Sequence, residues 1–326
     1  MKAIVYYNYG SPEVLRFQEI ERPSVGDNEV LLKVRAASVN PYDWHFLRGM
    51  PYLLRALAGL RKPKDKRLGV DVAGHVEAVG RRVSEFKPGD AVFGACRGAF
   101  AEYACASEAK LAAKADKLTF EQTAAVPIAG LTALQGLRRG GLSNQPGQMV
   151  LINGAAGGVG TFAVQIAKTF GAEVTGVCST GNVEMVRSIG ARHVIDYTQE
   201  DFTKSGLRYD LILDCVANHS LSAFRRLLNT KGSYIMVGAA DGGGRWMIGL
   251  VARLLRAFVL SRFVSQTLMM VGAKISKEDL IFLQELIKAG KVTPVIDRHY
   301  SLKELPDAIR YLEQGHARGK VVITFP

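Results

Sequence analysis

The chain has 326 residues, of which 48% are hydrophobic and 22% are charged. This length and balance are typical of a globular protein with two domains of roughly 150 residues each. The most apolar segment, 246–264, is interrupted by Arg253, Arg256 and Arg262, which argues against a membrane-spanning helix. The N-terminal residues show neither an apolar signal region nor a cleavage site, so we expect a mature, cytoplasmic protein.

The cysteine spacing and the net charge bear on which metal sites and binding partners are expected. Cys96, Cys105, Cys178 and Cys215 have none of the paired spacings of zinc sites or redox dithiols, so we expect neither disulfides nor a structural zinc. The net charge of +12 admits nucleic acid, an anionic membrane or an anionic ligand. Aromatic residues are not interleaved with the basic clusters as a surface for single-stranded nucleic acid requires, and we expect no nucleic-acid partner.

The first 120 or so residues consist of short β-rich runs separated by turn signals. Strands are expected at 2–6, 29–36, 70–79 and 90–94. Pro-Ser, Val-Gly-Asp and Lys-Pro-Gly-Asp sequences lie between them and favour turns. This half of the chain is therefore predicted to be an all-β barrel or sandwich.

From about residue 149, apolar strands alternate with helical stretches. Strands are expected at 150–152, 173–178, 193–196, 210–214 and 233–237, and helices are expected to start near Gly157, Asn182 and Asn218. This alternation predicts a parallel sheet with helices on both faces. Strands at 292–295 and 320–325 around a helix at 304–314 are expected to rejoin the first domain.

A glycine-rich turn separates a buried strand from an amphipathic helix. Gly154, Gly157 and Gly160 have the spacing G-x-x-G-x-x-G. Such glycines let the backbone turn sharply and let the pyrophosphate of a dinucleotide approach the helix N-terminus, where unpaired N–H groups favour anions. The alternative is a tight structural turn without a ligand. Cofactor contacts are expected along the whole turn, at Gly154, Ala155, Ala156, Gly157, Gly158, Val159 and Gly160.

The residues after the second strand of this unit bear on the choice of cofactor. No carboxylate occurs between Val174 and Val183, where NAD-binding folds place an acid for the ribose 2′-hydroxyl. Ser179, Thr180 and Asn182 can instead donate hydrogen bonds to a 2′-phosphate, which predicts NADPH. The alternative is that they are ordinary helix-cap and turn residues.

Six segments of the chain carry a family resemblance. They are 36–43, 69–74, 86–93, 125–133, the glycine turn, and 315–320. Together they resemble the medium-chain dehydrogenase/reductase superfamily, in its zinc-free quinone oxidoreductase-like branch. The resemblance implies an α/β protein with a GroES-like β-rich catalytic domain (1–122), a doubly wound parallel-sheet Rossmann domain (123–290) and a C-terminal segment (291–326) that completes the catalytic domain. It places the active site in the cleft between the domains.

The same resemblance bears on zinc. Zinc-dependent members carry a Cys near 40–43, a His-Glu pair near 69–71 and a second Cys or Asp near 127–130. This chain has Asn-Pro-Tyr-Asp, Gly-Val-Asp and Pro-Ile-Ala-Gly there. Since catalytic zinc needs three protein ligands, we expect no metal, and a zinc alcohol dehydrogenase is disfavoured.

The implied activity is hydride transfer from NADPH to a quinone or an α,β-unsaturated carbonyl, because such acceptors spread the resulting charge onto an oxygen. By resemblance, Asn40 and Thr132 are expected near the nicotinamide and Tyr197 near the 2′-phosphate. Val216, Gly238 and Lys320 complete the expected cofactor contacts. For the catalytic set we name Tyr52 as first proton donor, then Lys320, with Asp43 orienting Asn40 or its loop.

Two segments of the chain have an unusual content of basic and apolar residues. Segment 55–67 carries six basic residues against one acid, and 241–271 combines apolar residues with spaced arginines. The apolar residues and spaced arginines of 241–271 are expected to line a pocket for a large apolar acceptor, long-chain ones included. Peripheral contact with an anionic membrane is the alternative. Strand 266–271 is expected either to form a homodimer edge or to be buried. The rival function is a non-catalytic NADPH-binding protein with a structural or RNA-binding role.

Overall fold

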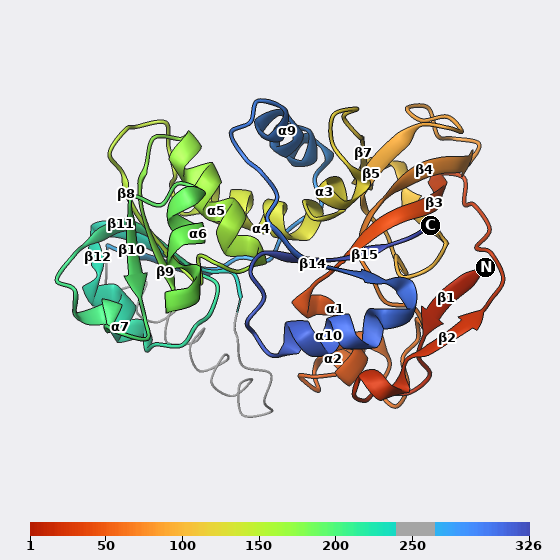
Figure 1. Cartoon of the computed structure of the whole chain (residues 1–326), viewed down its shortest axis with the longest axis horizontal. Helices are drawn as coiled ribbons and strands as arrows, with labels where there is room; N and C mark the ends of the chain where they lie inside the picture. Colours follow the sequence, from red (N-terminus) through yellow and green to blue (C-terminus); the bar gives the residue numbers. More distant parts are fainter. Residues whose placement is uncertain (239–264) are drawn as a thin grey trace. The chain divides into compact units, whose positions relative to one another are not determined.

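The computed structural model describes residues 1–238 and 265–326 (Figure 1). The chain forms two compact units, one from 1–131, 275–289 and 296–326, the other from 132–274 and 290–295. Segment 275–289 thus groups with the first unit, whereas the boundary expected at 290 assigns it to the second. The domain boundaries at 122 and 290 stay a prediction.

The first unit is built on strands, as the turn-punctuated N-terminal half predicts. A two-stranded sheet holds β1 (Lys2–Val5) and β2 (Arg16–Glu19). A seven-stranded sheet has the order β14-β15-β3-β4-β5-β7, with β6 pairing β3. Its strands are β3 (Glu29–Val39), β4 (Asp71–Val79), β5 (Ala91–Ala95), β6 (Tyr103–Ser107), β7 (Leu111–Ala113), β14 (Ile296–Ser301) and β15 (Lys320–Thr324). The C-terminal strands therefore do join the first unit.

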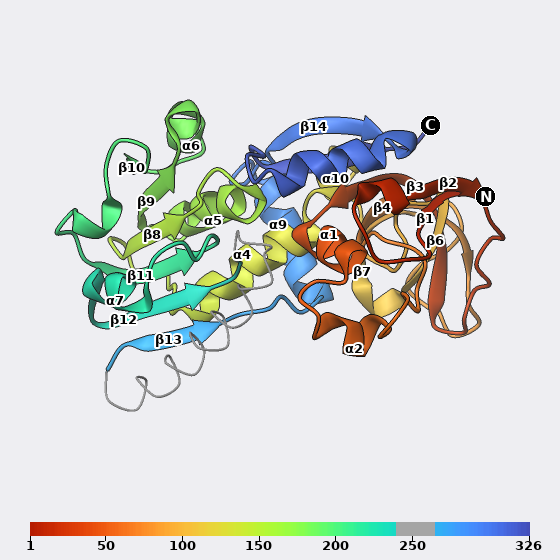
Figure 2. The same cartoon turned by 90° about the horizontal axis from the view of Figure 1, so that it is seen from below.

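Helices and single turns complete the first unit. They are α1 (Pro41–Arg48), α2 (Leu54–Ala58), α3 (Phe120–Ala124), α9 (Lys277–Lys288) and α10 (Leu305–Glu313), with single turns at Pro12–Val14, Glu108–Lys110 and Leu302–Glu304. Helix α10 buries Leu305, Ala308 and Ile309 in the core of the unit and lies beside β14 in Figure 2. Spacing of three and four residues gives it one apolar face.

The second unit is a six-stranded sheet with the order β10-β9-β8-β11-β12-β13, parallel throughout. Its strands are β8 (Met149–Asn153), β9 (Glu173–Cys178), β10 (His193–Asp196), β11 (Tyr209–Asp214), β12 (Leu228–Met236) and β13 (Thr267–Met270). Numbered along the chain, this order is 3-2-1-4-5-6, the doubly wound order of dinucleotide-binding folds. Its strand order reverses between β8 and β11, where such folds bind their ligands.

Helices pack on both faces of this sheet. They are α4 (Pro127–Arg139), which begins in the first unit, α5 (Gly158–Thr169), α6 (Val183–Ser188) and α7 (Leu221–Arg226), with single turns at Thr180–Asn182 and Phe202–Lys204. Alternate residues of β11 face opposite ways. A Cβ at Gly136 of α4 would meet Leu213, whereas Ile212 packs with Phe224 of α7. The predicted α/β class with a doubly wound parallel sheet is confirmed.

One predicted strand is wrong. Residues 292–295 form no strand, and β14 begins at Ile296. The backbone of Thr293 is bonded instead by the side chain of Gln165, whose Oε1 accepts from Thr293 N (2.7 Å) and whose Nε2 donates to Thr293 O (3.0 Å). A side-chain amide therefore takes both backbone groups that a strand partner would use.

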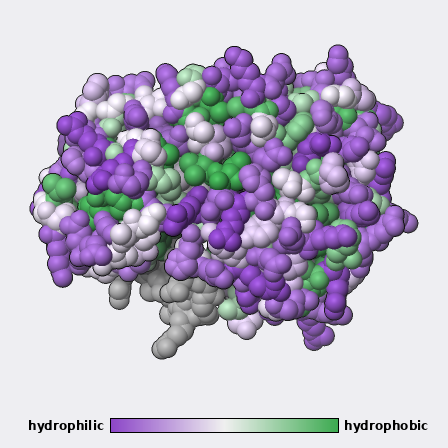
Figure 3. Space-filling model, in the orientation of Figure 1, coloured by the Kyte–Doolittle hydropathy of each residue, from purple (hydrophilic) through white to green (hydrophobic). Residues whose placement is uncertain are grey.

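The surface drawn in Figure 3 is mostly hydrophilic, with separate hydrophobic areas. Within residues 1–238 and 265–326, no helix combines the length and apolar character needed to cross a bilayer. The apolar segment 246–264, with its two expected roles, lies outside the described residues.

Candidate active site

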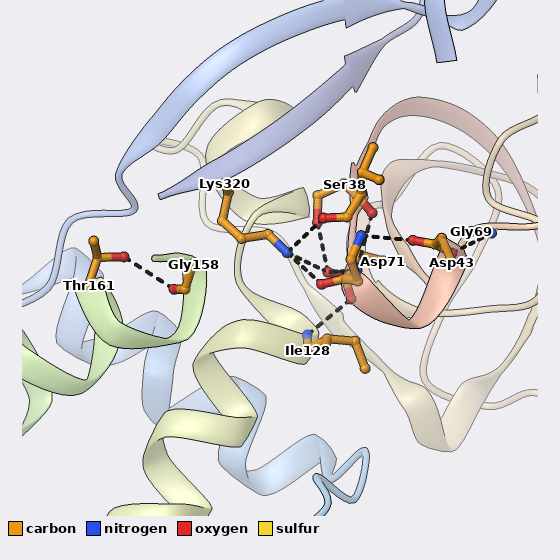
Figure 4. Close-up of polar contacts among 10 residues, drawn as sticks. Ser38, Asp43, Gly69, Asp71, Ile128, Gly158, Thr161 and Lys320 are labelled. Atoms are coloured by element: carbon orange, nitrogen blue, oxygen red, sulfur yellow. Dashed lines mark hydrogen bonds and ion pairs between the residues drawn. The ribbon is translucent and has the colours of Figure 1, made fainter. Parts of the chain in front are cut away.

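Strand register brings four polar side chains together inside the first unit. Ser38 of β3 lies opposite Asp71 of β4, and Val39 of β3 lies opposite Val321 of β15. Lys320 therefore lies beside Asn40, the residue that follows Val39. All four side chains are buried, including the charged Asp71 (0% exposed) and Lys320 (3%). We call Ser38, Asn40, Asp71 and Lys320 the Asp71 cluster, and Figure 4 shows its contacts.

Every polar atom of Asn40's side chain is used within the cluster. Its Nδ2 donates to Asp71 Oδ2 (2.9 Å) and to Ser38 O (3.2 Å), and its Oδ1 accepts from Lys320 Nζ at 2.6 Å. Lys320 Nζ also lies 3.4 Å from Val39 O and 3.5 Å from Asp71 Oδ2. Asn40 is thus held by protein contacts on both sides of its amide, which fits a positioning role.

Asp71 connects three separate segments of the first unit. Its Oδ2 accepts from the Ser38 hydroxyl at 2.7 Å, and its Oδ1 accepts from the backbone N–H of Ile128 at 3.0 Å. The nearby ammonium of Lys320 balances its charge, which an apolar interior would otherwise strongly disfavour. Burial lowers the pKa of Lys320, while the Asp71 and Asp43 charges act to raise it.

Asp43 is a second buried carboxyl next to this cluster. It accepts hydrogen bonds from the backbone N–H groups of Asn40 (2.8 Å) and Gly69 (3.0 Å), and so fixes the start of α1. Burial raises the pKa of Asp43 to about 7, against the lowering effect of these N–H groups. Asp43 therefore anchors the start of α1, and its orienting role in catalysis stays a prediction.

The zinc question can be tested on this geometry. The three segments that hold ligands in zinc-dependent members meet here, at Asn40, Asp71 and Ile128. They present an amide, one carboxylate and an aliphatic side chain, with the Lys320 ammonium against the two oxygens. This set does not fit zinc, which takes thiolate, imidazole and carboxylate ligands. No group of three potential ligands occurs elsewhere in the described ranges 1–238 and 265–326 either.

Tyr52, the expected first proton donor, lies outside the Asp71 cluster. It is 64% exposed and precedes α2, and the Arg55 guanidinium lies 4.8 Å from the centre of its ring. The Asp71 cluster is buried, whereas the Tyr52 side chain is largely in contact with solvent. Its assignment as a donor stays a prediction.

The glycine turn has the geometry that close approach of a ligand requires. Gly154 follows β8 directly and has φ of +84°, a conformation that favours glycine. A Cβ on Gly160 would lie 2.1 Å from Gly154 O, so only glycine lets α5 start so close to the strand. Gly157 caps α5, whose first turn contains no acid. The unpaired N–H groups there can bind a phosphate.

Polar residues at the carboxyl ends of β8 and β11, which the sequence reasoning missed, are hydrogen-bonded to one another. Asn153 Nδ2 donates to Asp214 Oδ1 (2.8 Å) and to Asn218 Oδ1 (3.0 Å), and Tyr234 OH donates to Asp214 Oδ2 (2.6 Å). Asp214 Oδ1 also accepts from Val216 N at 3.1 Å. The available signal was a polar residue ending an otherwise apolar strand.

Three expected cofactor residues, Gly154, Val216 and Gly238, lie just after the carboxyl ends of β8, β11 and β12. A Cβ on Gly154 would lie 2.7 Å from Val216 Cγ2, and one on Gly238 would lie 2.8 Å from the backbone oxygen of Cys215. The residue after Val216, Ala217, has φ of +61°, which is strained for a non-glycine residue. Thr132 lies in α4 and is buried; its expected contact with a nicotinamide stays a prediction.

The β9–α6 turn differs from the sequence expectation in one respect. A carboxylate does lie beside it, supplied by the neighbouring strand, because Asp196 of β10 pairs with Cys178 of β9. Thr198 Oγ1 donates to Asp196 (2.7 Å) and lies 2.8 Å from Thr180 Oγ1. Hydrogen bonds from Thr180 and Thr198 hold the pKa of Asp196 below its usual range. The hydroxyl proton of Thr180 is thus already used in a hydrogen bond within the protein.

Ser179 and Asn182 keep donors available. Asn182 Nδ2 donates to Ser179 Oγ at 3.0 Å, which leaves the Ser179 proton and the second amide proton without an acceptor in the described part of the chain. A cavity of about 280 Å³ lies nearby, lined by Tyr197, Thr198, Gln199, Glu200, Asp201, Phe202, Asn218 and His219. Tyr197, which is 52% exposed, faces the same end of the sheet.

Comparison with known proteins identifies the family. The alcohol dehydrogenase GroES-like domain family matches residues 26–116, and a family described as zinc-binding dehydrogenase matches 189–323. A mitochondrial NAD(P)H oxidoreductase of Mus musculus is 37% identical over 99% of this chain and 89% of its own length. The chain belongs to the medium-chain dehydrogenase/reductase superfamily, in its quinone oxidoreductase-like branch.

Two further relatives agree with this assignment. The 2-methylene-furan-3-one reductase of Solanum lycopersicum is 34% identical over 99% of this chain and 79% of its own length. The solved quinone oxidoreductase of Coxiella burnetii is 31% identical, with a TM-score of 0.86 over 100% of this chain and 99% of that one. The protein is accordingly an oxidoreductase that uses a nicotinamide cofactor. Its β-rich unit is GroES-like and its parallel-sheet unit is Rossmann-like.

Proposed function

We propose that this oxidoreductase is a zinc-independent, NADPH-dependent reductase of quinones or α,β-unsaturated ketones. The observation that carries the proposal is the Asp71 cluster, in which the ammonium of Lys320 contacts the residues at two ligand positions of zinc-dependent members. An oxidoreductase without a Lewis acid needs an acceptor that stabilises the added electrons by itself. Quinones and enones do so by placing the charge on an oxygen.

The relatives' names support the same two acceptor classes. One relative is named as a reductase of a methylene-furanone, which is an enone, and one solved relative is named as a quinone oxidoreductase. When bound, the cofactor supplies the hydride. The backbone N–H groups of 154–160 would bind its pyrophosphate at the α5 N-terminus. Asn40, Asp43 and Lys320 would position the α1 loop, and water would supply the proton, because the donors of Lys320 already face Asn40, Val39 and Asp71.

The preference for NADPH is proposed to be modest. Ser179 and Asn182 would donate to the 2′-phosphate, and Tyr197 would flank the adenosine end beside its cavity. The carboxylate of Asp196 lies next to Thr180 and repels a phosphate, which reduces the advantage over NADH. The expected proton donor Tyr52 and the expected nicotinamide contact of Thr132 are kept as secondary proposals.

The test is NADPH oxidation, followed by the absorbance of reduced nicotinamide. The acceptors are 9,10-phenanthrenequinone, a short enone and a long-chain enone, and each is repeated with NADH. We expect turnover with the quinone or an enone and a higher rate with NADPH. Binding of NADPH without reduction of any acceptor would instead support the non-catalytic rival. Metal determination on the purified protein that finds one tightly held zinc per chain would refute zinc independence.

A homodimer and a cytoplasmic location are also proposed. β13 lies at one end of the six-stranded sheet, with Met270 49% exposed, whereas Leu268 is buried. Such an edge can pair with a second copy and extend the sheet. Light scattering of the eluted protein tests this, and a monomer at micromolar concentration would exclude a stable dimer.

A further inference from the structure

The most exposed large hydrophobic side chains of the described residues are close neighbours in the chain. Tyr52 is 64% exposed, Leu53 is 68% exposed and Leu60 is 75% exposed. All three flank α2. Single exposed hydrophobic residues are common on protein surfaces, but a local group of the most exposed ones marks a binding surface.

Basic residues follow directly in the chain. Arg61, Lys62, Lys64 and Lys66 are exposed, and the first three form no ion pair within the described ranges 1–238 and 265–326. The acid between them, Asp65, is turned to another partner. Its Oδ1 accepts from Arg67 N at 3.0 Å and lies 3.7 Å from Arg67 Nε. Among the described residues, the charges of Arg61, Lys62 and Lys64 therefore have no ion-pair partner.

The loop formed by residues 52–66 is held in a fixed shape. Gly59, with φ of +123°, ends α2, and a Cβ there would lie 2.1 Å from Lys62 O. Lys64 N donates to Ala58 O at 2.7 Å, and Tyr9 OH donates to Gly59 O at 2.6 Å. The Arg55 guanidinium lies 4.5 Å from the centre of the Tyr9 ring. A surface preformed in this way loses little conformational entropy on binding.

We propose that the 52–66 loop binds the surface of a bilayer that contains anionic lipids. Leu53 and Leu60 would enter the boundary between headgroups and acyl chains. Arg61, Lys62 and Lys64 would contact the lipid phosphates, and the net charge of +12 would attract the protein to such a surface from a distance.

Nucleic acid explains this combination less well. Its phosphates would use the basic residues, but aliphatic side chains offer bases no stacking surface, and the two leucines would remain in water. A lipid surface can contact both the leucines and the basic residues of the loop. The proposal is independent of the reductase chemistry, since none of the residues 53 and 60–64 belongs to the Asp71 cluster or the glycine turn.

The experiment is flotation with vesicles of phosphatidylcholine alone and of phosphatidylcholine with phosphatidylglycerol, at low and at physiological salt. We expect the wild-type protein to float only with the anionic vesicles, and less at the higher salt because screening weakens the attraction. The combined substitutions Arg61→Gln, Lys62→Gln and Lys64→Gln are expected to reduce partitioning by about a hundred-fold, since each basic residue contributes on the order of five-fold.

Two further variants distinguish binding by the 52–66 loop from attraction by the net charge of the protein. Lys87→Gln, Lys110→Gln and Lys117→Gln remove the same charge from exposed positions of the same unit and are expected to keep flotation near the wild-type level. Leu53→Ser with Leu60→Ser is expected to weaken partitioning at least ten-fold while the salt dependence remains. Thermal unfolding and NADPH oxidation of each variant verify that it folds.

The proposal is overturned if the wild-type protein stays with the bottom fraction in anionic vesicles at low salt. Equal losses in the loop variant and in the Lys87, Lys110 and Lys117 variant would also overturn it, because net charge alone would then explain binding. In a parallel filter-binding titration with single-stranded RNA, loss of RNA binding in the loop variant with unchanged flotation would identify nucleic acid as the partner instead.

Discussion

The ammonium nitrogen of Lys320 lies 2.6 Å from the side-chain oxygen of Asn40, and both residues are almost completely buried. These residues are 280 positions apart in the chain. Their contact depends on the pairing of β15 with β3, which places the C-terminal strand in the same sheet as the N-terminal half. An internal cation thereby serves an amide and a carboxylate that have no access to solvent.

Lys320→Met tests this internal charge balance. The substitution leaves the Asp71 carboxylate buried without its cation, and we expect the free energy of unfolding to fall by about 3–5 kcal/mol. Urea denaturation measures it, with Lys110→Met at an exposed position as the control, expected to change stability by under about 0.5 kcal/mol. Adding Asp71→Asn to Lys320→Met should recover part of the loss, because the uncompensated charge is gone. Equal stability of Lys320→Met and Lys110→Met would contradict the interpretation that Lys320 balances the buried charge of Asp71.

The pH dependence of stability reports on Asp43. Burial raises its pKa from 3.8 to about 7 in the folded chain. Between these values the folded protein holds a proton that the unfolded chain releases. The stabilisation is complete below pH 3.8 and is lost as the pH rises through about 7, with a slope of up to about 1.4 kcal/mol per pH unit.

Asp43→Asn removes this titration, so we expect its stability to change less with pH than that of the wild type. Urea midpoints at mildly acidic and neutral pH measure the difference between the two slopes. Asn cannot accept both backbone N–H groups as well as the carboxyl does, and a constant loss of about 1–3 kcal/mol is expected in addition. Parallel pH profiles for the two proteins would show that Asp43 does not titrate in this range.

Substitutions at two glycines of the turn distinguish the effect on packing from the effect on ligand binding. Gly160→Ala places a Cβ 2.1 Å from Gly154 O, whereas Gly157→Ala places one 3.5 Å from the same oxygen, an ordinary contact. We expect Gly160→Ala to lower the melting temperature by several degrees, since about 1–3 kcal/mol is lost to overpacking. Gly157→Ala should keep the melting temperature and weaken NADPH binding at least ten-fold, measured by nicotinamide fluorescence. A melting temperature unchanged in both variants would refute the close-packing explanation for Gly160.

Ser179→Ala and Thr180→Val test the donors for the 2′-phosphate. The Ser179 proton has no acceptor within the described residues, so we expect Ser179→Ala to weaken NADPH binding about ten-fold, as for a charge-assisted hydrogen bond. The Thr180 proton is already used toward Thr198 and Asp196, and Thr180→Val should change NADPH binding less. NADH binding serves as the internal control in each variant. A larger loss in Thr180→Val than in Ser179→Ala would reverse this assignment of donors.

The cofactor unit could be predicted from the sequence to a large extent. Its strands are continuous apolar runs, and the turn from Gly154 to Gly160 joins a strand directly to a helix. Local spacing is enough there, because the strand, the turn and the helix N-terminus are consecutive in the chain. The strand expected at 292–295 was wrong because a side chain distant in sequence, Gln165, bonds the backbone of Thr293. Periodicity carries no information about such a partner.

The sequence by itself therefore determined the two-part α/β organisation, the glycine turn and the family motifs, since each depends on residues that are near one another in the chain. Tertiary structure alone decided the partners of the site residues. Register pairing places Asp196 beside the β9–α6 turn and Lys320 beside Asn40 and Asp71. The physical reason is that burial and hydrogen bonding between distant strands set the state of a charged group, and sequence spacing does not fix which strands become neighbours.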